Sequence, residues 1–150
     1  ICIEEEQDIV YREAPAAGAP KPNPAPAPEP AARSQKMIPD PVLLFRYSAL
    51  TSNGHRIHYD RTYAQQEEDY RDLVVHGPLT ATLLQGFASE DGHRLKRFEF
   101  RGMAPLFVDR PFSLQTGDLK NGEMSLWAKG PDGELAMQAS AVVDQNVAYI

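Results

Sequence analysis

The sequence predicts an α+β fold in which an antiparallel sheet wraps around one buried helix. The helix is indicated by residues 79–88, which are apolar on nearly every side of a helical turn. The sheet is indicated downstream, where apolar and polar residues alternate with a period of two. Turn signals at 121–122 (Asn-Gly) and 131–133 (Pro-Asp-Gly) separate these alternating runs, as expected between the strands of β-hairpins.

The N-terminal part of the sequence divides into two segments before the globular domain. Residues 1–13 begin like a strand, because apolar residues keep alternate spacing at both ends of an acidic patch. Residues 14–36 hold seven of the thirteen prolines, and this composition predicts a semi-rigid, extended Pro/Ala linker, with a disordered tail as the alternative. We therefore expect the globular domain to span residues 37–150.

Two segments of less regular pattern precede the buried helix. Residues 42–50 mix aromatic and aliphatic side chains and fit either a strand or a short helix. Residues 60–73 are expected to be helical or irregular, with Asp60 as a possible N-cap. Pro78 suits the first turn of the buried helix, where its missing N–H would be unpaired anyway, and Gly92 suits the end of that helix.

Four runs with a period of two follow the buried helix and predict the strands of an antiparallel meander. Their apolar positions are Phe98 and Phe100; Phe112, Leu114 and Thr116; Met124, Leu126 and Ala128; and Leu135, Met137, Ala139, Ala141 and Val143. A helix that is apolar on every side needs a sheet curved around it. The sequence therefore predicts the hotdog arrangement.

Composition limits the classes of function. The chain of 150 residues suits one ordinary domain, and its formal net charge of −6 argues against a nucleic-acid binder. No apolar run approaches the length that spans a bilayer, so no membrane partner is expected. The single cysteine, Cys2, allows no internal disulfide, which fits the cytoplasm. The chain begins at Ile1 without an initiator methionine or a signal peptide, so we expect a processed or fragmentary sequence.

Three stretches of this sequence resemble one protein family. The stretches "FRYSALTSNGHRIHYDRTYA", "HGPLTATLLQGFA" and "RGMAPLFVDRPFSL" follow one another in the order found in the MaoC-like acyl-CoA dehydratases and hydratases. The resemblance covers residues 40–144. Within the group the chain looks most like the double-hotdog branch, which includes mesaconyl- and itaconyl-CoA hydratases and fungal-type 3-hydroxyacyl-thioester dehydratases.

The resemblance implies a hotdog domain that works with a second one. Two hotdog halves are joined in one chain in that branch, so residues 1–13 look like the closing strand of a preceding half and residues 14–36 like the linker. The pocket of this fold lies between two halves. The expected protein partner is therefore that second half or another subunit of a homo-oligomer such as a dimer.

The resemblance also implies a reaction. Family members add or remove water at the double bond next to the carbonyl of an acyl thioester, carried by CoA or a carrier protein, without a metal or a redox cofactor. This chemistry needs a proton-transfer group and hydrogen-bond donors for an enolate-like oxygen. The alternatives are an acyl-CoA thioesterase on the same fold, with Asp60 or Glu68 as its carboxylate, and a non-catalytic acyl-binding half.

Residues 51–63 contain the proton-transfer candidates. R-specific hydratases resembling this chain carry the motif Asp-x-Asn-Pro-x-His, which places its His at His58, its Asn at His55 and its Asp at Asn53. Asn53 cannot accept a proton at neutral pH, so we expect His58 to be the single acid/base and Asn53 to hold the water. Asp60 is expected to orient His58 or to cap the next helix. A structural turn residue is the alternative for His58, and a plain surface residue for His55.

His76 and Gly77 match the His-Gly pair at the start of the family's buried helix. A helix N-terminus offers unpaired N–H groups, so the Gly77 amide is the oxyanion-hole candidate, although helix initiation alone also explains the pair. His76 is expected to line the site by packing or hydrogen bonding. A zinc ion bound by His55, His58 and His76 is the rival hypothesis, but their spacing matches no zinc signature, so no metal is expected.

Cationic side chains on the predicted strands provide a candidate binding site for CoA phosphates. Arg101, Arg110 and Lys96 are the candidates, and ordinary solvated charges are the alternative. His93 lies in a polar turn and is expected to be solvated. Trp127 is expected to cover either an interface or the pocket.

Overall fold

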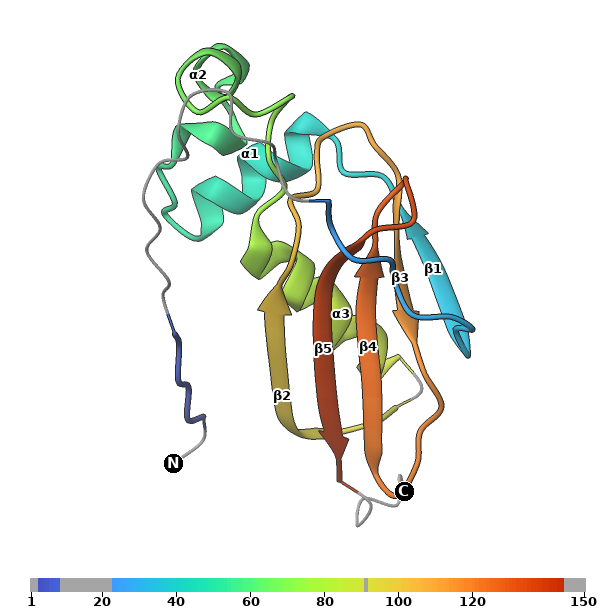
Figure 1. The fold of residues 1–150 in the computed structure, drawn as a ribbon. Helices are drawn as coiled ribbons and strands as arrows, with labels where there is room; N and C mark the ends of the chain where they lie inside the picture. Colours follow the sequence, from blue (N-terminus) through green and yellow to red (C-terminus); the bar gives the residue numbers. More distant parts are fainter. Residues whose placement is uncertain (1–2, 9–22, 91, 145–150) are drawn as a thin grey trace.

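The computed structural model describes residues 3–8, 23–90 and 92–144 of the chain. One antiparallel sheet of five strands has the order β1-β3-β4-β5-β2 (Figure 1). The strands are β1 (Arg33–Met37), β2 (Leu95–Gly102), β3 (Phe112–Thr116), β4 (Glu123–Lys129) and β5 (Leu135–Val143). The helices are α1 (Pro41–Leu50), the 3-10 helix η1 (Arg56–His58), α2 (Arg61–Gln66) and α3 (Gly77–Ser89).

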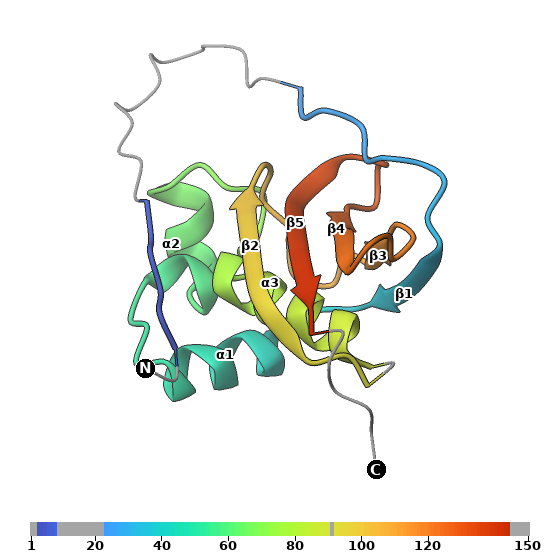
Figure 2. The same cartoon turned by 90° about the horizontal axis from the view of Figure 1, so that it is seen from below.

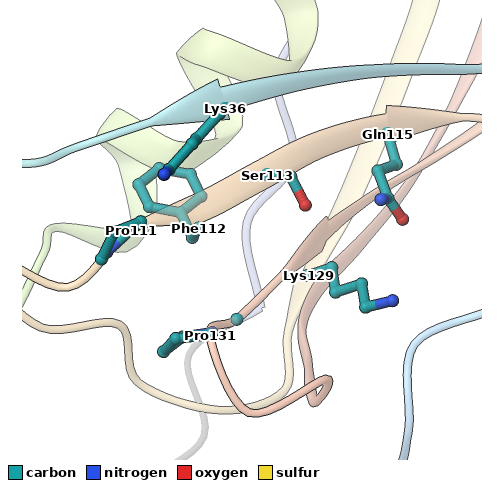
Figure 3. A pocket seen from close by; sticks show the side chains of 8 residues that line it. Lys36, Pro111, Phe112, Ser113, Gln115, Lys129 and Pro131 are labelled. Carbon is teal, nitrogen blue, oxygen red and sulfur yellow. The ribbon is translucent and has the colours of Figure 1, made fainter.

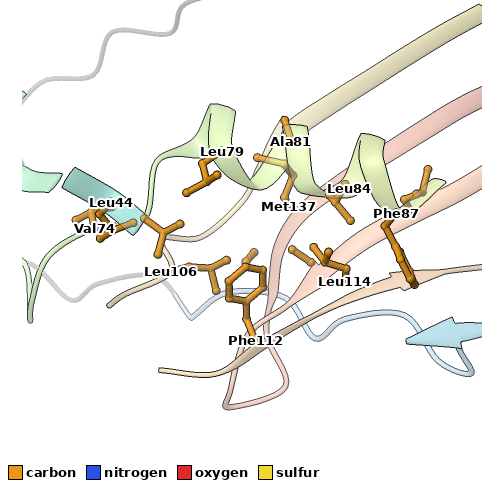
Figure 4. Close-up of a cluster of buried hydrophobic side chains, with 14 of the residues drawn as sticks. Leu44, Val74, Leu79, Ala81, Leu84, Phe87, Leu106, Phe112, Leu114 and Met137 are labelled. Atoms are coloured by element: carbon orange, nitrogen blue, oxygen red, sulfur yellow. The ribbon is translucent and has the colours of Figure 1, made fainter. Parts of the chain in front are cut away.

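The long helix α3 packs against the sheet, as the sequence predicts. It contacts β2, β3, β4 and β5, and the sheet curves around it (Figures 1 and 2). Leu84 and Phe87 of α3 meet Leu114 of β3 and Met137 of β5 in the buried apolar cluster (Figure 4). Burial of this apolar surface is the main stabilisation of the arrangement. The predicted α+β fold with a sheet-wrapped helix is confirmed.

One face of α3 remains exposed, although the apolar run predicts a helix that is buried rather than amphipathic. Pro78, Thr82, Gln85 and Gly86 are all exposed, and their spacing places them along one stripe of the helix. The sheet covers only the opposite side of α3. A prediction from the apolar run alone therefore gives more burial of the helix than the structure shows. The exposed residues are small or polar, which makes their contact with water inexpensive.

The predicted alternation is confirmed for the central strands, and β2 departs from it. β2 pairs only with β5 and forms one edge of the sheet among the described residues. Phe98 is half-buried, and Phe100 is 50% exposed. An edge strand has sheet on one side only, so an apolar residue near its end is not enclosed. β2 therefore presents an open hydrogen-bonding edge with aromatic residues on it.

Both predicted hairpin turns are present. Asn121 and Gly122 have φ angles of 53° and 83°, and Lys120 and Glu123 on either side exchange two backbone hydrogen bonds. Such a two-residue turn requires positive φ at both central positions, which Asn and Gly tolerate best. The second turn closes β4 onto β5 with Gly133 at a φ of 87°.

The two segments of less regular pattern both contain a helix, α1 in the first and α2 in the second. Asp40 caps α1, because its Oδ1 accepts from the Leu43 N–H at 2.7 Å, and Pro41 follows it in the first turn. The helix alternative for residues 42–50 is therefore correct. Asp60 caps α2 in the same way, accepting from the Tyr63 N–H at 3.0 Å. Among the described residues, no helix is long and apolar enough to cross a membrane.

Residues 23–32, called the strap here, run along the side of the sheet away from α3 (Figures 1 and 2). Backbone hydrogen bonds attach the strap from Ala27 N to Gly133 O, from Leu135 N to Ala25 O and from Ala32 N to Thr116 O, at 2.9, 2.8 and 2.7 Å. Glu29 also pairs with Lys129 of β4. The second half of the predicted linker is thus docked, and its last residues enter β1.

The predicted strand over residues 1–13 stays a prediction. Only residues 3–8 of that segment are described, and they are exposed and take no regular secondary structure. The rest of the segment, and the linker up to residue 22, lie outside the described residues.

Trp127 of β4 is buried on the side of the sheet opposite α3. It is 4% exposed, and its indole N–H donates to Gln115 Oε1 at 2.6 Å. Beside this pair lies an open hollow of about 430 Å³, which Gln115 borders together with Lys36 and Lys129 (Figure 3). Trp127 is therefore satisfied within this chain, by a residue of the neighbouring strand.

Candidate active site

Three segments meet at the N-terminal end of α3: α1, η1 and the strand-like segment that leads into the helix. The Val74 N–H donates to Ile57 O at 3.0 Å, and the Val75 N–H donates to Leu106 O at 2.8 Å. The first bond holds the chain just before His76 against η1, and the second holds it against the loop before β3. His58 of η1 is thereby brought next to His76, at the start of the buried helix.

The three candidate histidines of this region come together as predicted. The rings of His58 and His76 stack with centroids 3.6 Å apart and planes 16° from parallel. His55 presents its ring edge-on to His58 at 5.8 Å, and Tyr47 of α1 does the same to His76 at 4.9 Å. We call His55, His58 and His76 the histidine stack. Stacked rings do not aim their nitrogens at one point, and the described residues hold no group of three His, Cys, Asp or Glu suited to a metal ion.

His58 is held as a neutral base. Its ring is 7% exposed, and its Nδ1 lies 2.7 Å from the carbonyl oxygen of Val74. A carbonyl can only accept, so Nδ1 carries the hydrogen and Nε2 keeps its lone pair. Burial holds the pKa of His58 below its usual value. The hydrogen bond to Val74 raises this pKa, and the neighbouring His55 lowers it further. At neutral pH the His58 Nε2 is therefore able to accept a proton.

His76 is completely buried at the N-cap position of α3. Its Nε2 lies 2.8 Å from Ser48 Oγ, and its Nδ1 has no hydrogen-bond partner among the described residues. Burial, followed by the proximity of His58, lowers the pKa of His76 to about 4. His76 is therefore neutral at physiological pH, and it packs on His58 and pairs with Ser48 of α1.

The free energy of unfolding is expected to fall as the pH drops from 6.5 towards 4. The unfolded chain protonates His76 near its ordinary pKa of 6.5, whereas the folded chain does so only near 4. Stability from this residue is complete above pH 6.5 and is lost on acidification, by about 3 kcal/mol. Urea unfolding at pH 7 and at pH 4.5 measures the loss. The His76→Phe variant keeps a ring but cannot titrate, so an unchanged pH dependence in it would contradict this assignment.

Asn53 secures the loop that carries the histidines. Its Oδ1 accepts from the His55 N–H at 3.0 Å, a local turn that an aspartate would also form. Asn53 also borders a hollow of about 260 Å³, whose lining includes Ser48, Phe45 and Tyr59. The side chain thus lies at the edge of an apolar recess. Its role in holding water stays a prediction.

Gly77 is the first residue of α3 and is exposed. A Cβ atom built on it would meet no heavy atom within 4 Å, and its φ is outside the left-handed region. Neither packing among the described residues nor backbone conformation therefore requires a glycine here. The open space at this Cβ position is available to a group from outside the described chain.

The two carboxylates considered for a thioesterase are engaged in local structure. Asp60 caps α2 and pairs with Arg56 at 2.7 Å, and the Tyr63 N–H and then Arg56 hold the pKa of Asp60 below its usual value. Glu68 accepts from the Tyr63 hydroxyl at 3.0 Å and lies 3.9 Å from His55 Nε2. Of the two predicted roles for Asp60, the structure shows the helix cap.

The cationic candidates for CoA lie elsewhere. Arg101 is exposed on the edge strand β2, and Lys96 of the same strand pairs with Asp144 at 3.1 Å. Arg110, in the loop before β3, donates to both carboxylate oxygens of Asp132 at 3.0 Å. The structure does not bring these side chains to the histidine stack, and their binding of phosphates stays a prediction. His93 is partly exposed next to β2.

Sequence reasoning missed Ser48 and Tyr47, the two α1 residues that contact His76. No local motif links them to a histidine that lies 28 residues after Ser48. One signal was present, because Ser48 lies four residues after Leu44 and therefore on the same side of a helix. A hydroxyl at a core position needs a partner, which it finds here in an imidazole.

Solved structures with the same architecture define the class of this domain. The (R)-hydratase from A. caviae involved in PHA biosynthesis matches with a TM-score of 0.62 and 19% identity, over 77% of this chain and 96% of that one. A MaoC-like dehydratase from Phytophthora capsici matches with a TM-score of 0.69 and 15% identity, over 86% of this chain and 46% of that one. These likenesses establish the hotdog fold.

The sequence model of the family described as hydroxyacyl-thioester dehydratase type 2 matches residues 1–108, and the chain belongs to this family. It is 53% identical over 142 residues to the mesaconyl-C(4)-CoA hydratase of Chloroflexus aurantiacus, covering 93% of this chain and 50% of that protein. It is 38% identical over 126 residues to the mitochondrial hydroxyacyl-thioester dehydratase type 2 of Schizosaccharomyces pombe, covering 79% and 41%. The chain spans about half the length of the curated relatives it matches.

Proposed function

We propose that this domain supplies the acid/base half of a hydratase or dehydratase that acts at the α,β double bond of an acyl thioester. One observation carries the proposal: His58 is buried, donates through Nδ1 to Val74 and so keeps the lone pair of Nε2, while its ring stacks on His76, the N-cap residue of α3. The names of the relatives, a hydratase and a dehydratase, support the same reaction. The thioesterase alternative is not favoured, because Asp60 and Glu68 serve local structure.

In the hydration direction, His58 Nε2 takes a proton from water while the water oxygen bonds to the β-carbon. Electrons of the double bond move towards the carbonyl, and the α-carbon then receives a proton from the His58 imidazolium. The Gly77 N–H, at the positive end of the α3 dipole, stabilises the enolate-like oxygen. The Asn53 amide holds the water. Dehydration is the same path in reverse.

A second hotdog domain is proposed to complete the site. Within the described residues β2 has a free edge, which is a surface that a single domain leaves open to pairing with another strand. Either a preceding half of the same protein or another subunit supplies this domain. The substrate is proposed to be carried by CoA or a carrier protein, with Arg101 and Arg110 as candidate phosphate contacts. A reducing compartment such as the cytoplasm fits the single cysteine, Cys2.

The loss of enoyl-thioester absorbance by the full-length gene product tests the reaction. Crotonyl-, mesaconyl- and itaconyl-CoA form the panel, and at least one of them is expected to lose absorbance without release of free thiol. A thiol reagent in a parallel reaction detects CoA. Release of CoA would show a thioesterase, and no change with any of the three, or with their carrier-protein thioesters, would indicate a non-catalytic acyl-binding half.

A further inference from the structure

Ser48 and Tyr47, neighbours on α1, hold His76 from two sides. Ser48 is 6% exposed, and its Oγ lies 2.8 Å from Nε2 of the fully buried His76. The Tyr47 ring meets the same imidazole edge-on at 4.9 Å, with planes 64° apart. His76 makes no side-chain capping bond to α3. The hydrogen bond to Ser48 is therefore the polar contact that fixes this imidazole in the described part of the protein.

His76 in turn sets the environment of His58. The two rings are nearly parallel at 3.6 Å, and the Val74 carbonyl anchors His58 at Nδ1. The other titratable group that faces His58 is His55, which meets it edge-on. The direction of the His58 Nε2 thus depends on one hydrogen bond and on one stacking surface, and the stacking surface is His76.

Ser48 also selects the tautomer of His76. The Nδ1 of His76 is buried without a partner among the described residues, and a buried N–H without an acceptor is more costly than a bare lone pair. The favoured form therefore carries its hydrogen on Nε2 and donates it to Ser48 Oγ. The hydroxyl hydrogen of Ser48 then points away from His76, and Ser48 borders the hollow that Asn53 also borders.

We propose that Ser48 is a positioning residue for the reaction. Through its hydrogen bond to His76, it fixes the imidazole face on which His58 stacks and so directs the His58 Nε2. This inference rests on the proposed function for the role of His58. It extends the site to α1, which carries neither the acid/base nor the oxyanion-hole candidate.

Ser48→Ala in the full-length protein is expected to lower kcat by about 10- to 100-fold with little change in KM, because misdirection of a catalytic group acts on the chemical step. Ser48→Thr keeps the hydroxyl and is expected to retain most of the rate. Ser89→Ala is the matched control, since Ser89 is also a helical serine, whose Oγ donates to Gln85 O in α3. It is expected to behave like the unchanged protein.

Long-range ¹H–¹⁵N spectra of the histidine rings give a readout that does not depend on turnover. The expected forms are Nδ1–H for His58 and Nε2–H for His76, and Ser48→Ala is expected to lose the single form of His76. If Ser48→Ala does not fold, Ser48→Cys, with its weaker hydrogen bond, takes its place. Unchanged kcat, or an unchanged His76 spectrum, in the folded variant overturns the inference. If no thioester is hydrated by the unchanged protein, the proposed function fails, while the spectra still decide whether Ser48 fixes His76.

Discussion

Replacing His58 by alanine is expected to lower kcat for the preferred enoyl thioester by about 10²–10⁴-fold, the usual contribution of a positioned acid/base. The reason is the geometry at Nδ1, which the Val74 carbonyl occupies at 2.7 Å, so that Nε2 is the nitrogen available for proton transfer. Asn53 lacks a basic group and does not replace it. Measurement of kcat and KM by enoyl absorbance, on the full-length protein, checks the expectation.

His93→Ala is the matched control for this variant, because His93 is a histidine outside the stack, beside β2. It is expected to keep the full rate. The pH profile adds a second criterion: burial lowers the pKa of His58, so the acidic limb of kcat/KM is expected below pH 6.5. A His58→Ala variant that keeps more than about a tenth of the rate contradicts the acid/base assignment.

Replacing Gly77 by alanine is expected to lower kcat by about 10²-fold without loss of stability. The new methyl group would occupy the open space beside the Gly77 N–H and block the approach of the thioester oxygen that is proposed to bind there, and loss of one oxyanion donor costs about 10²–10³-fold. No atom of the described chain lies within 4 Å of that methyl position, so the fold itself has room for it. Kinetics and thermal unfolding, measured on the same preparation, separate the two effects.

Gly86→Ala provides the control, because Gly86 lies in the same helix, is exposed and also has no heavy atom within 4 Å of a built Cβ. Alanine is the better helix former by about 1 kcal/mol, so this variant is expected to be at least as stable and fully active. Equal activity of the Gly77 and Gly86 variants would assign Gly77 to helix initiation alone.

The sequence predicts the elements of this fold wherever one local rule dominates. Pro78 marked the first turn of α3, and Asn121 with Gly122 marked a hairpin, because each residue type suits one backbone conformation. β1 was missed because it is an edge strand with mostly exposed, polar residues and has no apolar period to detect. The exposed stripe of α3 was missed because composition does not show which side the sheet covers.

The residues of the candidate site could be predicted from the sequence only where they belong to a motif that is local in the chain. The resemblance located His58, His76 and Gly77, but not the stacking of two imidazoles that lie on different elements. Ser48 was missed for a similar reason: its spacing from Leu44 indicates a core position, but its partner His76 is 28 residues away and is brought to it only by the fold. The carboxylate of Asp60 had two possible roles in sequence, and the cap geometry decided between them.

The docked strap has a consequence for assembly. Its backbone bonds to Gly133, Leu135 and Thr116 anchor residues 23–32 to the sheet, so a tether to the proposed preceding domain would be counted from the strap and not from β1. A shorter tether raises the effective concentration of the domain that it carries. This concentration scales roughly with the inverse three-halves power of the tether length. If a preceding half of the same protein supplies the proposed second hotdog domain, the docked strap would favour association within one molecule over association between molecules.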